Sequence, residues 1–424
     1  MDGIAAGNLC NDWDSLAAGY VERGWQVDAS AWRAYAAVRD APNLKAVAAA
    51  LRAVYQPWLE SLAEQTQGWA ASYPMAAPAD SPLLEPTPGT LLVFVDGLRC
   101  DLGMELDRLL AQHGLSVEKA TRWTALPTVT ATVKPAWRPL ADGLVGSTLP
   151  EGFEPQIAET GKDLKTQALR NLLAKLGWDW LEPTSTGDPN GVAWTETGTF
   201  DHDGHNLGAR LAWRIEEELE AVALRVRDLL HAGWKRAVLI TDHGWLLLPG
   251  GLPKVELPGH LTLSRWPRCA VPQPGAEHGF KELPWSWGGG HSVVFAPGVS
   301  AFKTGVEYTH GGLSVQEALM PILTVTAGQQ TVQSVEIESA EWKGLRLRVK
   351  LKGGFAGTVL DIRTKVADAA SSVLDAERRM RRPDAEGSAA LLITDDEKEG
   401  TAAVLVVIRD GQVVAKRPVT VGGD

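Results

Sequence analysis

Cysteine is scarce in this 424-residue sequence, and its three copies, Cys10, Cys100 and Cys269, lie far apart. No CxxC pair occurs, and an odd number of cysteines cannot be fully paired within one chain. This argues against a disulfide framework and against a thiolate metal site. The first residues, MDGIAAGNLCND, also lack the basic and apolar regions of a signal peptide. We therefore expect a reducing, cytoplasmic environment.

Long apolar runs are missing too. Stretches such as AVAAALRAVY fall well short of the roughly 20 residues that a membrane helix needs, so we expect no membrane span. The net charge of −11 argues against a protein that coats nucleic acid non-specifically, although a local basic groove is compatible with it. Basic residues are dense only in ERRMRRPD (377–384). Such a run is more often a solvated loop than a contact for a phosphate backbone or an acidic partner.

Three regions differ in pattern. Residues 1–87 form a predicted helical segment and linker: apolar residues recur at helical spacing over 1–72, and a Pro-rich stretch follows at 73–89. Residues 88–330 alternate apolar runs with helical patterns, which predicts an α/β/α sandwich built on a mostly parallel sheet. Residues 331–424 have short alternating segments with Asp-Gly and Gly-Gly turns, typical of a small antiparallel β-domain. The apolar runs predicted as buried strands of the sandwich are TLLVFVDG (90–97), RAVLITDHG (236–244) and, less clearly, HSVVFAPG (291–298).

Acidic and imidazole side chains follow these predicted strands, at the edge where such sheets bind ligands. The stretch FDHDGHNLG (200–208) adds two more candidates in a predicted loop, and another histidine begins HGG before a short helix. Singly, these residues are also common as turn and cap residues. Together they form a cysteine-free set that suits Zn²⁺ or Mn²⁺, and two ions rather than one. The six candidates are Asp96, Asp201, His205, Asp242, His243 and His310.

A nucleophile is expected in LPTVTATVKPAW (126–137), between a predicted strand and a helix. Its candidates are Thr128, Thr130 and Thr132. A hydroxyl at a helix N-terminus meets backbone N–H groups, and a nearby metal ion lowers its pKa. Capping the helix is the plainer role for any one of these threonines.

Taken in order, the motifs VDGLRCD, PTVT, DHDGH, TDHGW and THGGLSVQE resemble the alkaline-phosphatase superfamily. Within it, the chain is similar to the PglZ family of the BREX and phage-growth-limitation defence systems of bacteria. The resemblance covers about residues 88–330. It implies that Asp96, Thr130, Asp242 and His243 surround one metal ion, and that Asp201, His205 and His310 hold the other. Thr130 would be the nucleophile, with Thr128 as the second choice, and His202 and Asp203 would be spacers or outer support.

The resemblance implies a metal-dependent phosphoester hydrolase, with phosphodiesters favoured, that uses two ions, Zn²⁺ ahead of Mn²⁺. Its substrate would be a phosphoester, nucleotide or nucleic acid, and its partners other BREX or Pgl subunits and a DNA methyltransferase. Arg99, Lys134 and His291 are candidate substrate or supporting contacts, and Asp101 is either support or a helix cap. The family usually carries more chain ahead of the metal domain than this sequence does.

Two alternatives stay open. A phosphotransferase or mutase of the same fold usually carries a large inserted domain, and none is evident between the threonines and Asp201. A non-catalytic scaffold would keep a metal site while binding a methyltransferase and other defence proteins. Such a scaffold is expected to lose some ligands, whereas this sequence has all six candidates and the threonine.

Overall fold

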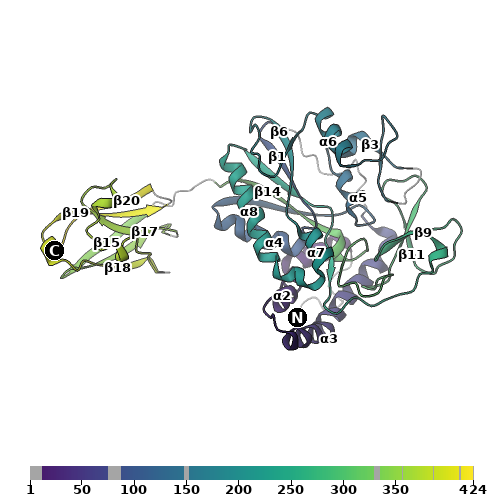
Figure 1. Cartoon of the computed structure of the whole chain (residues 1–424), viewed down its shortest axis with the longest axis horizontal. Coiled ribbons are helices and arrows are strands. Elements are labelled where there is room, and N and C mark those ends of the chain that lie inside the picture. The colour runs from purple at the N-terminus through teal and green to yellow at the C-terminus, as the bar shows by residue number, and fades with distance from the viewer. Residues whose placement is uncertain are drawn as a thin grey trace. The chain divides into compact units, whose positions relative to one another are not determined.

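The computed structural model describes residues 12–74, 87–147, 152–328, 335–355, 357–384, 386–409 and 412–423. The chain divides into two compact units, Met1–Gly328 and Gln329–Asp424 (Figure 1). The N-terminal helices, which the sequence sets apart, belong to the first unit. Most of the predicted Pro-rich linker lies outside the described residues.

The N-terminal region is helical, as its spacing predicts. It contains α1 (Trp13–Gly19), a π-helical turn (Tyr20–Gly24), α2 (Trp25–Ala36) and α3 (Ala41–Gly68). The Asp12 carboxylate caps α1 by accepting a hydrogen bond from the Ser15 N–H, and Asp40 caps α3 in the same way. The apolar face of α3 packs against the rest of the first unit through buried residues that include Trp58, Leu59 and Leu62.

A six-stranded sheet forms the centre of the first unit. Its order is β2 (Leu115–Trp123), β14 (Leu319–Ala327), β7 (Arg236–Ile240), β1 (Thr90–Val95), β6 (Val192–Thr197) and β5 (Asp179–Leu181). The last four strands are parallel, whereas β14 is antiparallel to both of its neighbours. The sheet is therefore mixed. The chain enters β14 directly from the one-turn helix α9 (Val315–Ala318), without the long crossover that a parallel strand requires.

Helices cover both faces of this sheet. Every side chain of β1 is buried, and alternate residues face opposite layers. Leu91 and Val93 pack with the apolar residues of α4 (Cys100–Gln112) and α8 (Ile215–His231). Leu92 and Phe94 pack with α6 (Thr166–Lys175) on the other face (Figure 1). This α/β/α layering places the carboxyl ends of β1, β6 and β7 at one edge of the sheet.

The predicted strand at 291–298 belongs elsewhere. Its core, β12 (Ser292–Phe295), lies in a separate antiparallel sheet with β11 (Lys281–Pro284), β10 (Cys269–Pro272) and β9 (Thr262–Arg265). The prediction was wrong because an apolar run identifies a buried strand but not the sheet that it joins. Two short pairs complete the first unit, β8 (Leu246–Leu247) with β13 (Tyr308–Thr309), and β3 (Leu144–Val145) with β4 (Gln156–Ile157).

The second unit contains two three-stranded antiparallel sheets around one apolar core, which confirms the predicted small antiparallel region. One sheet has the order β15 (Glu336–Lys343), β16 (Arg346–Lys352) and β18 (Ser388–Leu392). The other has the order β17 (Val359–Arg363), β19 (Ala402–Arg409) and β20 (Gln412–Thr420). Along β16 buried and more exposed residues alternate, as expected for strands with one face on a core.

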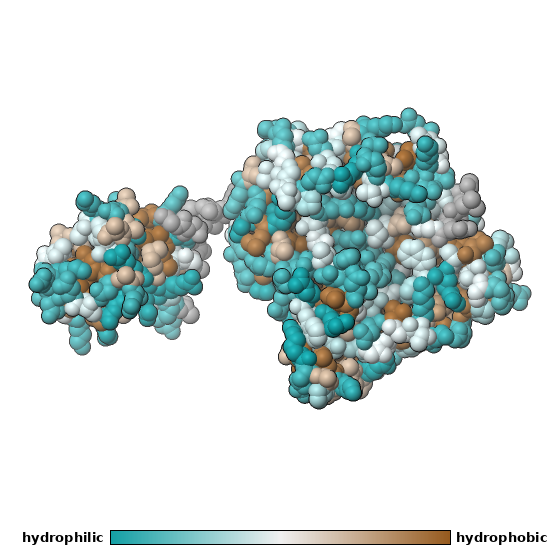
Figure 2. Space-filling model, in the orientation of Figure 1, coloured by the Kyte–Doolittle hydropathy of each residue, from teal (hydrophilic) through white to brown (hydrophobic). Residues whose placement is uncertain are grey.

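Within the described residues, no helix is long and apolar enough to cross a membrane. Hydrophilic residues cover much of the face drawn in Figure 2, with apolar residues in small groups.

Candidate metal centre

Two neighbouring parallel strands deliver three of the predicted ligands. Asp96 follows β1, and Asp242 and His243 follow β7. The strands pair in register up to Phe94 and Ile240, so their carboxyl ends lie side by side. His243 Nε2 lies 3.7 Å from Asp96 Oδ1 and 3.4 Å from Asp242 Oδ2. Asp242 and His243 are both fully buried.

Asp201 and His205 lie on a helix, α7 (Phe200–Leu207), and not in the predicted loop. The prediction missed this helix because DHDGH contains a glycine and lacks an apolar period. The helix explains the spacing, since residues four apart project from the same face. Asp201 Oδ1 lies 3.4 Å from His205 Nε2. The helix approaches the end of β1 at Gly97, where a β-carbon would lie 3.1 Å from the Asp201 nitrogen.

His310, just after β13, completes the cluster. Its Nε2 lies 3.4 Å from Asp201 Oδ1 and 3.2 Å from His205 Nε2. Its ring stacks on that of His243, with centroids 3.7 Å apart. Two triplets have ligand atoms within 4.8 Å of one another, and they share Asp201. They are Asp201, His205 and His310, and Asp96, Asp201 and His243.

Hydrogen bonds to backbone carbonyls fix how the two stacked histidines present their nitrogens. His243 Nδ1 lies 3.0 Å from the Gly244 oxygen, and His310 Nδ1 lies 2.9 Å from the Thr128 oxygen. A carbonyl only accepts, so each Nδ1 carries a proton and donates it. In the neutral ring Nε2 then has a free lone pair, which is the form that binds a metal ion.

The carboxylates supply the second observation that fits a cation. Asp96 Oδ1 and Asp242 Oδ2 are buried and have no hydrogen-bond partner among the described residues. Both oxygens face His243 Nε2, which carries no proton when Nδ1 does. The two oxygens and this nitrogen are therefore acceptors that point at one another with no hydrogen-bond donor between them. Buried acceptors without partners are costly, and a divalent ion among them removes that cost. The donor set therefore fits the metal ions that the sequence implies.

The charges at the site shift several pKa values. Burial, followed by the nearby carboxylates of Asp242 and Asp201, raises the pKa of Asp96 well above its usual range. Burial also acts to raise the pKa of Asp201, but its three histidine neighbours outweigh this effect and lower it. Burial, with His243 adding to the effect, lowers the pKa of His310 to about 4. At neutral pH His310 is thus neutral and able to act as a ligand.

The three threonines have different surroundings. Thr130 Oγ1 lies 3.3 Å from His243 Nε2, and Thr130 is half-buried rather than sealed. Thr128 is fully buried; its hydroxyl donates to the Gly312 oxygen and accepts from the Gly311 N–H. Thr132 is buried under Trp285. Thr130 alone of the three places its hydroxyl on the ligand cluster, on the four-residue helix α5 (Thr130–Val133).

The three residues predicted as substrate or supporting contacts have different surroundings. The Arg99 guanidinium is buried, forms a double hydrogen bond with Asp101 at 2.6 and 2.9 Å, and donates to the Trp245 oxygen. This burial leaves no access for a substrate, so of the two predicted roles of Arg99 the structure favours support. Lys134 Nζ pairs with Glu196 Oε1 at 2.5 Å, one helical turn after Thr130. His291 lies just before β12 and is in neither ligand triplet.

Two supporting features escaped the sequence analysis. The Tyr308 hydroxyl donates to Asp201 Oδ1 at 2.9 Å and so orients a carboxylate that both triplets share. The buried pair Arg268 and Glu317 holds the loop after His310, since Glu317 Oε1 accepts from the Gly312 N–H at 2.8 Å. The motif YTHGGLSVQE contains Tyr308 and Glu317, so their nearness to His310 in sequence was the available signal.

No protein-family model and no curated protein matches the sequence. Among solved structures, the chain is similar to murine ectonucleotide pyrophosphatase/phosphodiesterase 5, with 11% identity and a TM-score of 0.36 over 57% of this chain and 88% of the other. An inactive variant of the murine protein in complex with AMP gives 12% and 0.35, and the human protein 11% and 0.34, with the same coverage.

Proposed function

We propose that this chain is a metal-dependent phosphoester hydrolase that favours phosphodiesters. Asp96, Asp242 and His243 would hold one divalent ion, and Asp201, His205 and His310 the other. The observation that supports this most is the set of buried carboxylate oxygens without partners, which face an imidazole nitrogen beside the Thr130 hydroxyl. Three imidazoles among six ligands favour Zn²⁺, with Mn²⁺ as the second choice.

Two divalent ions in this position would supply Lewis-acid chemistry, lowering the pKa of a hydroxyl and offsetting the charge of phosphoryl oxygens. The chain would supply the nucleophile. Thr130 Oγ1 would attack phosphorus as one alcohol leaves with the hydroxyl proton, so that the remaining phosphoryl group, still carrying its second ester, is joined to Thr130. Water would then cleave the bond between Oγ1 and phosphorus, releasing a phosphomonoester and the free hydroxyl. The half-buried position of Thr130 leaves its oxygen accessible, whereas the Thr128 hydroxyl is occupied on both sides. Lys134, with its ammonium group near Glu196, would contribute positive charge close to the nucleophile.

The biological setting stays a proposal that rests on the sequence resemblance. A PglZ-like chain would act in the cytoplasm within a BREX-type defence system, beside other BREX or Pgl subunits and a DNA methyltransferase. A non-catalytic scaffold has less support, because the six ligands and Thr130 lie together. A mutase has less support as well, because the described residues between Thr130 and Asp201 form only short elements that belong to the sheet or pack on it.

The test is hydrolysis of a bis-aryl phosphodiester and an aryl phosphomonoester by the purified chain, metal-free and loaded with Zn²⁺ or Mn²⁺. Thr130→Ala is expected to lower the metal-dependent rate by roughly 10³-fold or more, as loss of a nucleophile does. Thr184→Ala, at an exposed position remote from the ligands, is the matched control and should retain activity. No turnover of either ester by metal-loaded wild type would favour the scaffold.

A further inference from the structure

The second unit has a strand edge with unused backbone groups. β18 pairs with β16 on one side only, as the last strand of its sheet. The Ile393 N–H donates to the Leu345 oxygen, and the Leu351 N–H donates to the Gly387 oxygen. These two hydrogen bonds determine which residues of β18 direct their backbone groups toward β16. Residues 389 and 391 therefore direct their backbone groups to β16, and residues 388, 390 and 392 direct theirs to the open side.

Only the first of these three outward residues has partners. The Ser388 oxygen accepts from the Asp384 N–H, and the Ser388 N–H donates to Asp384 Oδ1, both at 2.8 Å. For Ala390 and Leu392, no hydrogen bond on the open side occurs among the described residues. The chain that turns at Asp384 thus begins beside β18 and then diverges from it, because Arg381 pairs instead with Leu360 of β17.

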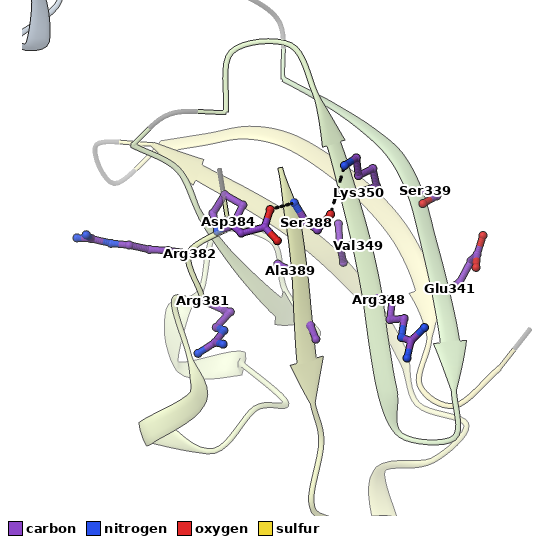
Figure 3. A pocket seen from close by; sticks show the side chains of 12 residues that line it. Ser339, Glu341, Arg348, Val349, Lys350, Arg381, Arg382, Asp384, Ser388 and Ala389 are labelled. Carbon is purple, nitrogen blue, oxygen red and sulfur yellow. Dashed lines mark hydrogen bonds between the residues drawn. The ribbon is translucent and has the colours of Figure 1, made fainter. Parts of the chain in front are cut away.

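This divergence leaves a slot between the edge of β18 and residues 377–382. The slot has a volume of about 520 Å³, and residues 390–392 line its other side. A second pocket of about 570 Å³ continues from it across the exposed face of β16. Figure 3 shows this pocket, with Arg381, Arg382 and Asp384 on one side of β18 and Arg348 and Lys350 on the other.

The walls of the two pockets carry a positive surplus, because six Lys and Arg side chains line them against Glu341, Glu377 and Asp384. The second unit as a whole has 15 Lys and Arg and 15 Asp and Glu, so the surplus is local. Among the described residues, none of the lining arginines forms an ion pair within 4 Å. These arginines are Arg348, Arg378, Arg379, Arg381 and Arg382. Cations that have no ion-pair partner and gather along a slot raise the local concentration of anionic groups.

We propose that this slot binds an acidic peptide segment of a partner protein in extended conformation, as an added strand on β18. The Ala390 and Leu392 backbone groups would pair with the peptide, and Arg381 and Arg382 would meet its carboxylates. Strand addition to an exposed edge is a recurring mode of peptide recognition in which backbone hydrogen bonds supply affinity. The small side chain of Ala390 leaves room at the edge.

A nucleic acid strand fits this surface less well. Grooves that bind single strands combine positive charge with aromatic side chains on which bases stack. Among the residues that the structure describes, neither pocket has an aromatic lining residue. The slot instead offers a strand edge whose backbone repeat matches that of another peptide.

Binding to the full chain can be measured by fluorescence anisotropy with a labelled ten-residue peptide that alternates Glu and Val. The same peptide with Lys for Glu, and a ten-nucleotide oligo-dT, are the comparison probes. Arg381→Glu with Arg382→Glu should weaken binding of the Glu peptide by roughly tenfold or more. Lys416→Glu with Arg417→Glu, at exposed positions on β20 outside both pockets, is the charge-matched control and should leave affinity unchanged.

Ala390→Pro separates strand addition from charge attraction, because it removes an edge N–H and keeps every arginine. It should weaken binding to a similar extent while its thermal unfolding matches wild type. In the wild-type chain the peptide should also slow amide hydrogen exchange at Ala390 and Leu392, which requires no variant. Tighter binding of oligo-dT than of the Glu peptide would overturn the proposal in favour of nucleic acid. Equal affinities for the Glu and Lys peptides, or unchanged exchange at both amides, would overturn it as well.

Discussion

The imidazole rings of His243 and His310 lie parallel, with 3.7 Å between centroids and 4° between planes. Each ring donates its Nδ1 proton to a backbone carbonyl on its own side of the cluster. The stack therefore presents two Nε2 lone pairs, one toward Asp96 and Asp242 and the other toward Asp201 and His205. This arrangement is expected of two neighbouring ion sites rather than of one.

Removing one ring should accordingly remove one ion. We expect about two Zn²⁺ per wild-type chain and about one in His310→Ala, measured by elemental analysis after dialysis. His202→Ala is the matched control, because His202 is on the same helix as His205 but points to Asn206. Retention of both ions by His310→Ala, or loss of one by His202→Ala, would contradict the two-site assignment.

Metal binding should release protons at a pH below the raised pKa of Asp96. Burial and the neighbouring carboxylates raise this pKa in the metal-free chain, so below it an ion has to displace the carboxyl proton. The affinity should therefore rise with pH until the pH passes this raised pKa. His310, with a pKa of about 4, contributes no proton above pH 6. Titration calorimetry in two buffers with different ionisation enthalpies measures the release, and identical heats in both buffers would contradict it.

Substitutions of Thr128 and Thr130 should lower the free energy of unfolding by different amounts. Thr128→Val leaves the buried Gly311 N–H and Gly312 oxygen without partners and should cost about 1–3 kcal/mol of unfolding free energy. Thr130→Val should cost less than about 0.5 kcal/mol, because its hydroxyl is half-buried and has one long contact.

Urea unfolding of the metal-free chain, followed by tryptophan fluorescence, tests this pair. Sixteen of the 17 tryptophans lie before residue 329, so the signal reports the first unit. A larger loss of stability for Thr130→Val than for Thr128→Val would reverse the roles given to the two residues.

The sequence indicated the positions of the strand-end candidates well, because a charged pair after a buried strand has no packing role. Asp96, Asp242 and His243 follow β1 and β7 as their motifs predict. It did not indicate α7, whose helical form depends on packing against the end of β1 rather than on an apolar period. Nor could it predict that β14 enters the sheet antiparallel, since an apolar run has no direction.

The sequence also did not indicate the supporting role of Arg99, because that role depends on a partner far away in sequence. Arg99 reads as a phosphate contact because it lies three residues after Asp96. Its burial depends on α2, where the Trp32 indole N–H donates to Asp101 Oδ2. That partner is 69 positions away in sequence, and local patterns do not report such distances. The N-terminal helices thus determine that Arg99, a residue of the sandwich, is buried.

The buried cluster around Arg99 and Asp101 also contains Asp28. Asp28 accepts hydrogen bonds from the Tyr20 and Tyr55 hydroxyls and from Gln316 Nε2, and it shares the charge of Arg99 with Asp101. Arg99→Met would leave Asp101 buried without its cation, which should cost about 3–5 kcal/mol. Lys175→Met, which breaks an ion pair whose side chains are 62% and 70% exposed, should cost much less, because water screens the pair.

The cost of Arg99→Met should also depend on pH. Burial comes first among the causes that raise the pKa of Asp28 to about 6, and Arg99 acts in the opposite direction. Asp28 is therefore mostly protonated in the folded chain at pH 5 and mostly charged at pH 7.5, where it relies on Arg99. A raised carboxyl pKa means that stability falls as pH rises from the unfolded value toward 6. In the same fluorescence-detected unfolding, Arg99→Met should lose less free energy of unfolding at pH 5 than at pH 7.5. An equal loss at both pH values would show that the charge of Asp28 does not contribute.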